Sequence, residues 1–291
     1  MADVPTYTAA LVPDLTSRTA IVTGGGGGIG AATAEVLAAR GARVVLAVRD
    51  TDKGARAARA MGGRVEVRPL DLASLDSVRA FAARWDEPVD LLVNNAGTSV
   101  RERRLTADGF ELQFGTNHLG PFALTNLLLR HVTGRVVSVS SQAERMGRLD
   151  FDDLNSERRP YRESRAYAAS KLANLLFTAE LQRRLTAAGS TVTAVAAHPG
   201  YVATGMTAGD GGAVSRLAVR FLAQSPAQGA LPVLYAATGD VPGGAFTGPE
   251  RAMHMRAGAQ RIGRSRQAAD PELARRLWAV SEELTGVGFG L

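Results

Sequence analysis

The sequence has no cysteine, few aromatic residues and very little lysine. Without cysteine, the 291-residue chain cannot form disulfide frameworks, cysteine nucleophiles or cysteine-ligated metal sites. Aromatic residues make up 5% of the chain. No run of about 18 apolar residues occurs, so the sequence predicts no membrane span. Lys53 and Lys171 are the two lysines among 34 basic residues, and the rest are arginines.

The charge balance is nearly even, and apolar residues are plentiful. The net charge of +6 is modest for this length, and no aromatic-rich basic motif indicates nucleic-acid binding. The amino end carries Asp3 and Asp14 without a continuous apolar stretch, so an export signal is not indicated. With 45% hydrophobic residues the chain can bury a full core. We therefore expect a single cytoplasmic domain, residues 1–291.

Short apolar segments alternate with longer segments of helical spacing. Strands are expected at residues 19–23, 43–48, 64–68, 89–93, 135–139 and 191–197, with a further strand near Ala245. Helices are expected at 29–40, 74–85, 164–188, 213–223, 226–237 and 271–284. This alternation predicts an α/β fold: one doubly wound domain with a parallel sheet of about seven strands and helices on both faces.

A glycine-rich loop follows the first expected strand and leads directly into a helix. In such a loop, backbone amides and the positive end of the helix can hold a pyrophosphate. Five consecutive glycines fit many spacings, so a flexible turn is the alternative interpretation. With Gly24, Gly28, Ile29 and Gly30 in place, the segment reads T-G-x-x-x-G-I-G. It resembles the short-chain dehydrogenase/reductase family, which implies a Rossmann fold and a nicotinamide dinucleotide.

The end of the second expected strand indicates which dinucleotide is bound. A carboxylate there accepts hydrogen bonds from the ribose hydroxyls of NAD, whereas the 2′-phosphate of NADP needs a cation. Val48 stands where relatives that prefer NAD usually have Asp, and Arg49 follows with a guanidinium suited to phosphate. We therefore favour NADP(H) over NAD(H). Alternatively, Arg49 is an ordinary solvated residue, and Lys53 either assists it or is solvated too.

Other motifs at strand ends match cofactor contacts of the family. The resemblance implies adenine contacts from Asp71 and Leu72, although Asp71 alone also suits a helix start. It also implies contacts from the N-N-A-G motif, of which we select Asn94, Ala96 and Gly97.

A further motif follows the last strand of the core. In H-P-G-Y-V-A-T the resemblance implies nicotinamide contacts, at Pro199, Gly200, Val202 and Thr204.

Tyr167 and Lys171 are spaced i, i+4 at the start of an expected helix, so both face the same side. A nearby ammonium favours the phenolate, and we expect it to move the pKa of Tyr167 toward working pH. The resemblance implies that Tyr167 exchanges a proton with the substrate oxygen. It also implies that Lys171 binds the nicotinamide ribose, that Ser141 binds the substrate oxygen, and that Asn117 holds a water linking Lys171 to solvent. Ser140 is the alternative to Ser141.

The long interval between Ser141 and Tyr167 contains an insertion, which resembles the retinol-dehydrogenase and protochlorophyllide-reductase-like branch of the family. Within the domain, we assign residues 14–200 to the cofactor and catalytic core, and 201–291 to a substrate lid and C-terminal extension. Apolar side chains that either form the lid or pack in the core are Tyr201, Met206, Leu217 and Phe221.

Together, these motifs favour an NADP(H)-dependent oxidoreductase that interconverts an alcohol and a ketone or aldehyde, with an apolar small-molecule substrate. Two alternatives remain: a catalytically idle NADP(H) sensor, and a reductase of an activated carbon–carbon double bond. No metal-ligand pattern occurs, so we expect no catalytic metal. The resemblance implies a homodimer or homotetramer, paired through the helices that carry Asn117 and Tyr167.

Overall fold

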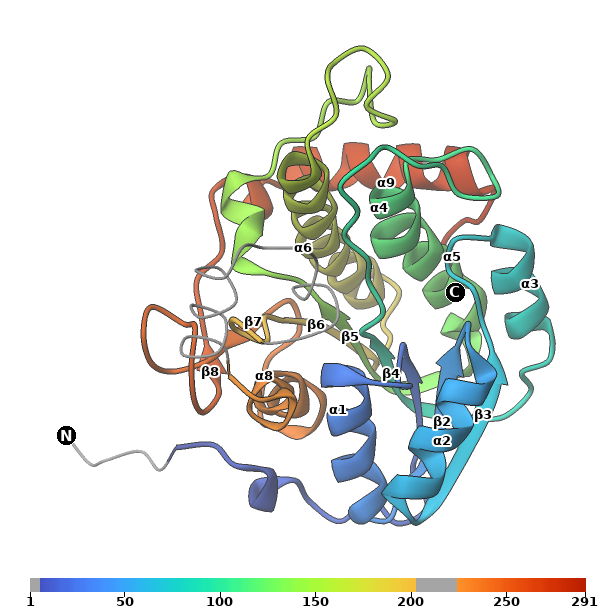
Figure 1. Cartoon of the computed structure of the whole chain (residues 1–291), viewed down its shortest axis with the longest axis vertical. Coiled ribbons are helices and arrows are strands. Elements are labelled where there is room, and N and C mark those ends of the chain that lie inside the picture. Colours follow the sequence, from blue (N-terminus) through green and yellow to red (C-terminus); the bar gives the residue numbers. More distant parts are fainter. Residues whose placement is uncertain (1–5, 203–223) are drawn as a thin grey trace.

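The computed structural model describes residues 6–202 and 224–291, which form a sheet covered by helices on both faces (Figure 1). In this part of the chain the sheet has eight strands in the order β3-β2-β1-β4-β5-β6-β7-β8. All neighbouring strands are parallel except β8, which runs antiparallel to β7. The strands are β1 (Thr19–Thr23), β2 (Arg43–Val48), β3 (Arg64–Pro69), β4 (Val89–Asn94), β5 (Val132–Val139), β6 (Thr193–Ala197), β7 (Phe246–Gly248) and β8 (Gln260–Arg261).

The strand order reverses next to β1. From β1 the chain moves outward to β2 and β3, then crosses back to place β4 on the other side of β1. Ala20 of β1 is in register with Val44 of β2 on one side and with Leu91 of β4 on the other. A crevice at the carboxyl ends of the strands is expected at such a reversal, and it is the usual ligand site of this architecture.

Alternating side chains of each strand feed two separate cores. In β1, Ala20 and Val22 face the layer of α1, α2 and α8, whereas Ile21 faces the layer of α3, α5 and α6. Outside α5 and α6 lies α9, whose Trp278 stacks against Phe177. The longer helices are α1 (Gly28–Ala39), α2 (Thr51–Met61), α3 (Leu75–Ala83), α5 (Gly120–Leu128), α6 (Glu163–Ala187), α8 (Pro226–Thr238) and α9 (Pro271–Thr285).

Several helices begin where a short polar side chain caps them. Asp50 accepts a hydrogen bond from the Lys53 amide at the start of α2, and Ser74 accepts one from the Ser77 amide at the start of α3. These caps satisfy amides that have no partner within the helix. In contrast, α1 begins after Gly27 without a side-chain cap, so its first amides remain open toward the glycine loop.

The expected α/β architecture is confirmed, with differences in detail. The structure adds elements to which the pattern assigned no range: α2, α5 with the short helix α4 (Leu112–Phe114) before it, and the short strand β8. The expected strand at 135–139 begins earlier, at Val132, and the expected strand near Ala245 is β7. The helix expected at 213–223 lies outside the described residues. Among the residues that the structure describes, no helix is both long and apolar enough to cross a membrane.

Candidate active site

The glycine loop is built around close backbone contacts. Gly24 and Gly28 have φ angles of +69° and +56°, in the left-handed region that favours glycine. A Cβ atom on Gly30 would lie 2.4 Å from the Asn95 side-chain nitrogen and 2.7 Å from the Gly24 carbonyl oxygen. Asn95 in turn donates to the Thr23 carbonyl at 2.8 Å. The two motifs therefore interlock, and side chains at these glycines would displace the loop.

A cleft of about 460 Å³ opens at the carboxyl ends of the strands, next to the glycine loop. Its volume lies in the usual range of small-molecule sites. Both lysines of the chain, Lys53 and Lys171, line it. Of the residues predicted from the sequence, the cleft is lined by Gly24, Gly28, Ile29, Gly30, Arg49, Asp71, Leu72, Ala96, Gly97, Tyr167, Lys171 and Pro199.

The end of β2 presents two cations to this cleft. Arg49 is exposed directly after the strand, and Lys53 is exposed in the first turn of α2. The Lys53 side chain reaches back over the glycine loop: a Cβ atom on Gly27 would lie 3.3 Å from its Nζ. Both cations can reach an anionic group held at the open end of α1.

The two asparagines at the end of β4, its last residue Asn94 and the following Asn95, have different environments. Asn94 is buried and donates to the Thr125 hydroxyl at 2.8 Å, so its side chain belongs to the core. Asn95, which the sequence interpretation did not select, lines the cleft. Adjacent strand residues point to opposite faces, so an offset of one position decides which amide is available.

The environment of Asp71 resolves its alternative interpretation as a helix cap. Ser74 caps α3, while the Asp71 carboxylate accepts a hydrogen bond from the Ala73 amide at 2.9 Å and lines the cleft. Leu72 follows it as a buried side chain.

Asn117 lies where a helix is interrupted. The short helix α4 (Leu112–Phe114) continues into α5 through one π-helical turn, η2 (Gly115–Leu119). Insertions of this kind frequently mark functional sites. Asn117 accepts from the Thr98 amide at 2.7 Å and donates to the Thr98 carbonyl and the Ser170 hydroxyl, each at 3.0 Å. A Cβ atom on Gly97 would lie 3.3 Å from the Asn117 Oδ1 and 3.5 Å from the Lys171 Nζ, so both groups face one point of the cleft.

Tyr167 and Lys171 lie one turn apart in α6. The Lys171 Nζ is 5.5 Å from the centre of the Tyr167 ring and donates to the Val139 carbonyl at 3.1 Å. Only 3% of Lys171 is exposed, and burial lowers its pKa to about 8. Burial also raises the pKa of Tyr167 above its ordinary value, although a hydrogen bond with Ser141 lowers it. The expected downward shift of the Tyr167 pKa is therefore wrong here, because removing the phenol from water disfavours its anion.

The two serines after β5 have separate roles. Ser140 is buried and donates to the Lys171 carbonyl at 2.7 Å, which ties β5 to α6. Ser141 is partly exposed and forms the hydrogen bond with the Tyr167 hydroxyl. Of the two alternatives, Ser141 is the one that faces the tyrosine.

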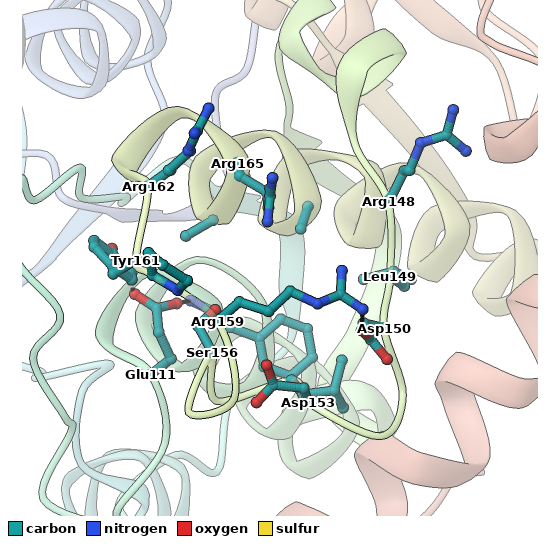
Figure 2. A pocket seen from close by; sticks show the side chains of 15 residues that line it. Glu111, Arg148, Leu149, Asp150, Asp153, Ser156, Arg159, Tyr161, Arg162 and Arg165 are labelled. Carbon is teal, nitrogen blue, oxygen red and sulfur yellow. Dashed lines mark hydrogen bonds and ion pairs between the residues drawn. The ribbon is translucent and has the colours of Figure 1, made fainter.

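The insertion after Ser141 clamps the segment that carries Asn117. A small pocket of about 60 Å³ lies between the insertion, α4 and the start of α6, and Figure 2 shows the side chains that line it. There the Tyr161 hydroxyl donates to the buried Glu111 carboxylate at 3.0 Å and accepts from the Gln113 side chain at 2.6 Å. Glu111 also caps α4 through the amides of Gln113 and Phe114. Through these contacts the insertion fixes the start of the interrupted helix.

The segment after β6 is only partly described. Pro199 lines the cleft, and its carbonyl accepts from the Gln224 side chain at 2.6 Å. Gly200 has a φ of +79°. Val202 is buried. Neither Gly200 nor Val202 is part of the described lining of the cleft.

Other predicted residues of this region have no described position. Thr204, and the lid residues Met206, Leu217 and Phe221, lie outside the described residues. The Tyr201 side chain is partly exposed, and its amide donates to the Met255 carbonyl at 3.2 Å.

Two buried histidines lie near the cleft but serve packing. His118 is enclosed by Phe114, Phe122 and Phe177, and its Nε2 lies 2.9 Å from the Ser281 hydroxyl. Burial lowers its pKa to about 3, and burial lowers that of His198 to about 4. Within residues 6–202 and 224–291, no cluster of three His, Asp or Glu side chains is placed to hold a metal ion.

The chain resembles known proteins along almost its whole length. A model of the short chain dehydrogenase family matches residues 18–212. Retinol dehydrogenase 13 of Homo sapiens is 43% identical, with 93% of this chain and 85% of that protein aligned. Polyprenol dehydrogenase of Mus musculus is 42% identical, with 96% and 87% aligned.

Solved structures agree with these sequence matches. The crystal structure of an uncharacterised protein from Mycobacterium Paratuberculosis is 51% identical, with a TM-score of 0.88 and 99% of this chain and 100% of that chain covered. A short chain dehydrogenase from Burkholderia cenocepacia J2315 in complex with NADP is 28% identical, with a TM-score of 0.64 and 80% and 96% covered. The chain therefore belongs to the short-chain dehydrogenase family, in its retinol-dehydrogenase-like branch, and is an NAD(P)-dependent dehydrogenase or reductase.

Proposed function

We propose that the protein is an NADP(H)-dependent oxidoreductase that interconverts an apolar alcohol and its ketone or aldehyde, with Tyr167 as general acid and base. The observation that carries this proposal is the buried Lys171 ammonium. It lies beneath the Tyr167 ring at the cleft and has no carboxylate partner among the described residues. An unpaired buried charge is costly, so its presence beside a phenol supports a role in proton transfer.

Each polar group at the cleft has a defined part in this chemistry. In the oxidation direction the substrate hydroxyl gives its proton to the Tyr167 oxygen, and the hydrogen on carbon departs with its electron pair as the carbonyl forms. The nicotinamide cofactor supplies the hydride acceptor, or the hydride donor in the reverse direction. Ser141 donates a hydrogen bond to the reacting oxygen, an electrostatic contribution. The Lys171 ammonium stabilises the phenolate, and Asn117 orients water for proton exchange with solvent.

The cleft suits a dinucleotide phosphate. Close packing at Gly24 and Gly30 leaves the amides at the start of α1 free to bind a pyrophosphate. Asp71, Ala96 and Gly97 would hold the remainder of the nucleotide. Arg49 and Lys53 at the end of β2 favour a 2′-phosphate, and the similar structure from Burkholderia cenocepacia was solved with NADP.

The names of the relatives, retinol dehydrogenase and polyprenol dehydrogenase, support an apolar alcohol or its aldehyde as substrate. The cytoplasmic location, the division at residue 200, and the homodimer or homotetramer stay predictions. Because Trp278 of α9 packs on Phe122 of α5 and Phe177 of α6, pairing through those helices would have to include α9.

Substituting Tyr167 by phenylalanine tests the general acid. Tyr167→Phe should lower kcat/KM with aldehydes by at least about 100-fold, because general acid–base catalysis contributes that much or more. The dissociation constant of NADPH, measured by fluorescence titration, should change less than about twofold. Tyr235→Phe is the matched control, since that ring packs on Tyr7 rather than at the cleft. Undiminished turnover in Tyr167→Phe would overturn the assignment of Tyr167 as general acid, whereas an absence of turnover in the wild-type protein would favour an idle NADP(H)-binding protein.

Reversing the charge at Arg49 tests the cofactor preference. Arg49→Asp should lower the ratio of NADPH to NADH affinity by about tenfold or more, because a charge-assisted hydrogen bond becomes a repulsion. Arg64→Asp makes the same change in charge at the opposite end of the neighbouring strand and should leave the ratio unaltered. An unchanged ratio in Arg49→Asp would remove this residue from phosphate recognition.

A further inference from the structure

The segment 249–259, between β7 and β8, has unusual backbone geometry. We refer to it as the β7–β8 loop. Ala252, Met253 and His254 are consecutive, and their φ angles are 51°, 53° and 65°. L-amino acids rarely adopt this left-handed region, and successive residues in it are rarer still. Such geometry persists only where the surroundings enforce it, and it concentrates at ligand sites.

Contacts from distant parts of the sequence hold the β7–β8 loop beside the candidate reaction centre. The side chain of Gln142, the residue after Ser141, donates to the Met253 carbonyl at 3.2 Å. The Tyr201 amide donates to the Met255 carbonyl at 3.2 Å. On the other side, the Ala257 amide donates to the Gln224 side chain at 3.1 Å. The loop is thus tied to the residue after Ser141 and to the described residues Tyr201 and Gln224.

The most exposed large apolar side chains in the described part of the chain lie here. Met253 is 88% exposed and Met146 is 72% exposed, more than any other large apolar residue described. Met146 ends η4 (Gln142–Met146), the same short helix whose first residue bonds the β7–β8 loop. Arg145 of η4 also donates to the Gly263 carbonyl, just beyond β8, at 3.1 Å. The two methionines therefore lie on segments that are bonded to each other, and one of these segments, η4, directly follows Ser141.

A single exposed apolar residue is ordinary, but two methionines on linked segments next to a polar reaction centre are not. Methionine is unbranched and polarisable, and it adapts to ligands of varied shape. An alcohol or carbonyl with a hydrocarbon chain would place its oxygen between Ser141 and Tyr167 and extend its chain outward over this surface. Contact with substrate would remove both thioethers from water.

We propose that Met253 and Met146 determine substrate specificity by forming the contact surface for the hydrocarbon chain, with the β7–β8 loop holding Met253 in place. This inference rests on the proposed function, because it assigns a substrate-binding surface to the same reaction. It identifies the preferred substrates as long-chain, flexible aldehydes and alcohols rather than short ones.

The test compares decanal and butanal in the NADPH-dependent reaction. In the wild-type protein, kcat/KM should be higher for decanal. In the double variant Met253→Gln, Met146→Gln, the decanal-to-butanal ratio of kcat/KM should fall by at least about tenfold, mainly through KM for decanal. Leu11→Gln is the matched control. That leucine is 55% exposed on the short helix η1 (Ala9–Leu11), and its replacement should leave the ratio unaltered.

The other outcomes separate this inference from the proposed function. A wild-type ratio in the double variant would overturn the inference, as would an equal loss with both aldehydes. If the wild-type protein reduces neither aldehyde and oxidises neither corresponding alcohol, the proposed function itself fails and the inference fails with it. Melting temperature and NADPH affinity, measured on every variant, identify a loss that comes from misfolding.

Discussion

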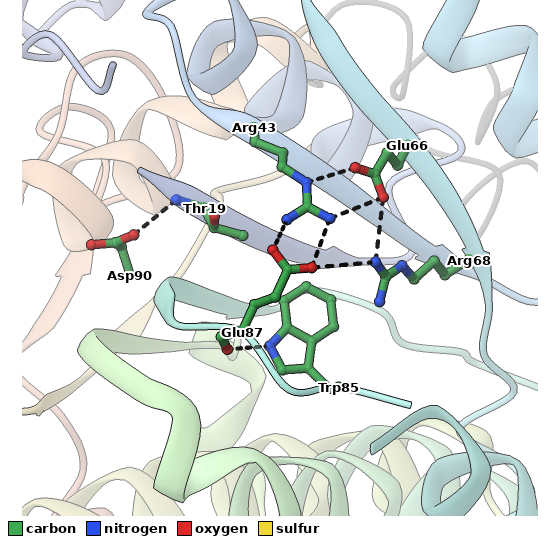
Figure 3. A network of polar contacts seen from close by, with 7 residues as sticks. All are labelled: Thr19, Arg43, Glu66, Arg68, Trp85, Glu87 and Asp90. Atoms are coloured by element: carbon green, nitrogen blue, oxygen red, sulfur yellow. Dashed lines mark hydrogen bonds and ion pairs between the residues drawn. The ribbon is translucent and has the colours of Figure 1, made fainter. Parts of the chain in front are cut away.

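Charged side chains have different partners at the two ends of the parallel strands: ion pairs at one end, and a backbone carbonyl at the other. At the amino-terminal edge of the sheet, the Arg43 guanidinium lies between the carboxylates of Glu66 and Glu87 (Figure 3). Arg68 joins the same network and lies over the Trp85 ring, 4.6 Å from its centre. At the carboxyl-terminal edge, Lys171 is buried with a backbone carbonyl as its partner.

The amino-terminal edge of the sheet thus contributes to stability, whereas the carboxyl-terminal edge of the same strands carries the candidate active site. The paired charges of this network support the fold, and none of them lines the cleft at the glycine loop. At the carboxyl-terminal edge, burial disfavours the charged form of Lys171. The glycine loop at the same edge has no side chains that could pack in the core. Residues at the two edges should therefore respond oppositely to substitution, which the following predictions test.

The largest effect is expected at Lys171. Replacing it with methionine keeps the volume and removes a buried charge whose pKa is lowered to about 8. The free energy of unfolding should rise, by about 3 kcal/mol at most, while turnover is lost. The Val139 carbonyl keeps a donor in the Asn174 side chain, at 3.2 Å. Urea denaturation measures the gain, and exposed Lys53→Met should show none. A less stable Lys171→Met protein would contradict the proposed contrast between the edges.

A smaller effect is expected from pH, through His118 and His198. In the folded state their pKa values are about 3 and about 4, below the ordinary value of 6.5. Because the unfolded chain binds protons first, stability is fully present above pH 6.5 and is lost as pH falls toward the folded values. As pH falls from 7 to 5, each histidine should lower the free energy of unfolding by about 2 kcal/mol.

Urea denaturation at several pH values measures this slope. His118→Gln should reduce the slope over this interval, because the variant has no buried imidazole at this position to protonate. An unaltered slope in His118→Gln would show that this residue is accessible to protons. The carboxylates with lowered pKa values, such as Glu66, titrate below this interval.

The smallest effect is expected at Arg43. Arg43→Met should lower the free energy of unfolding by about 1–2 kcal/mol, because Glu66 and Glu87 lose their partner but are exposed enough to be solvated. Thermal unfolding measures the loss, and kcat/KM at 25 °C should stay at the wild-type value. Arg64→Met, on the same edge without an ion pair among the described residues, is the control. Reduced activity in folded Arg43→Met would mean that the edges are not independent.

Short-range spacing predicted the parts of the molecule that depend on local geometry. The glycine loop and the Tyr167–Lys171 pair could be placed because a helix or a tight turn relates their members directly. By contrast, α2 was missed because the helix is polar overall: Gly54 is its only fully buried residue and Met61 its only large apolar one. The α4–η2–α5 region was not placed because its start depends on Glu111 and on Tyr161, far along the chain.

The sequence does not show which of two adjacent residues belongs to the site, nor how deeply a side chain is buried. Asn94 and Asn95 are adjacent, as are Ser140 and Ser141, and only the assembled fold shows that Asn95 lines the cleft and that Ser141 bonds Tyr167. The direction of the Tyr167 pKa shift also depends on burial, which is a property of the assembled fold. The sequence shows the neighbouring Lys171 ammonium, which favours a lower Tyr167 pKa, but it does not show the burial that raises this pKa.

That both lysines line one cleft has a consequence for chemical labelling. In a chain with 32 glycines and no cysteine, the amines of Lys53 and Lys171 and the chain terminus are the nucleophiles open to amine-directed reagents. Reductive methylation with isotope-labelled formaldehyde would therefore place its side-chain reporters within the cleft and nowhere else. Lys53, being exposed, would react first and report on whatever enters beside the glycine loop, while Lys171 would react only as fast as the cleft admits the reagent.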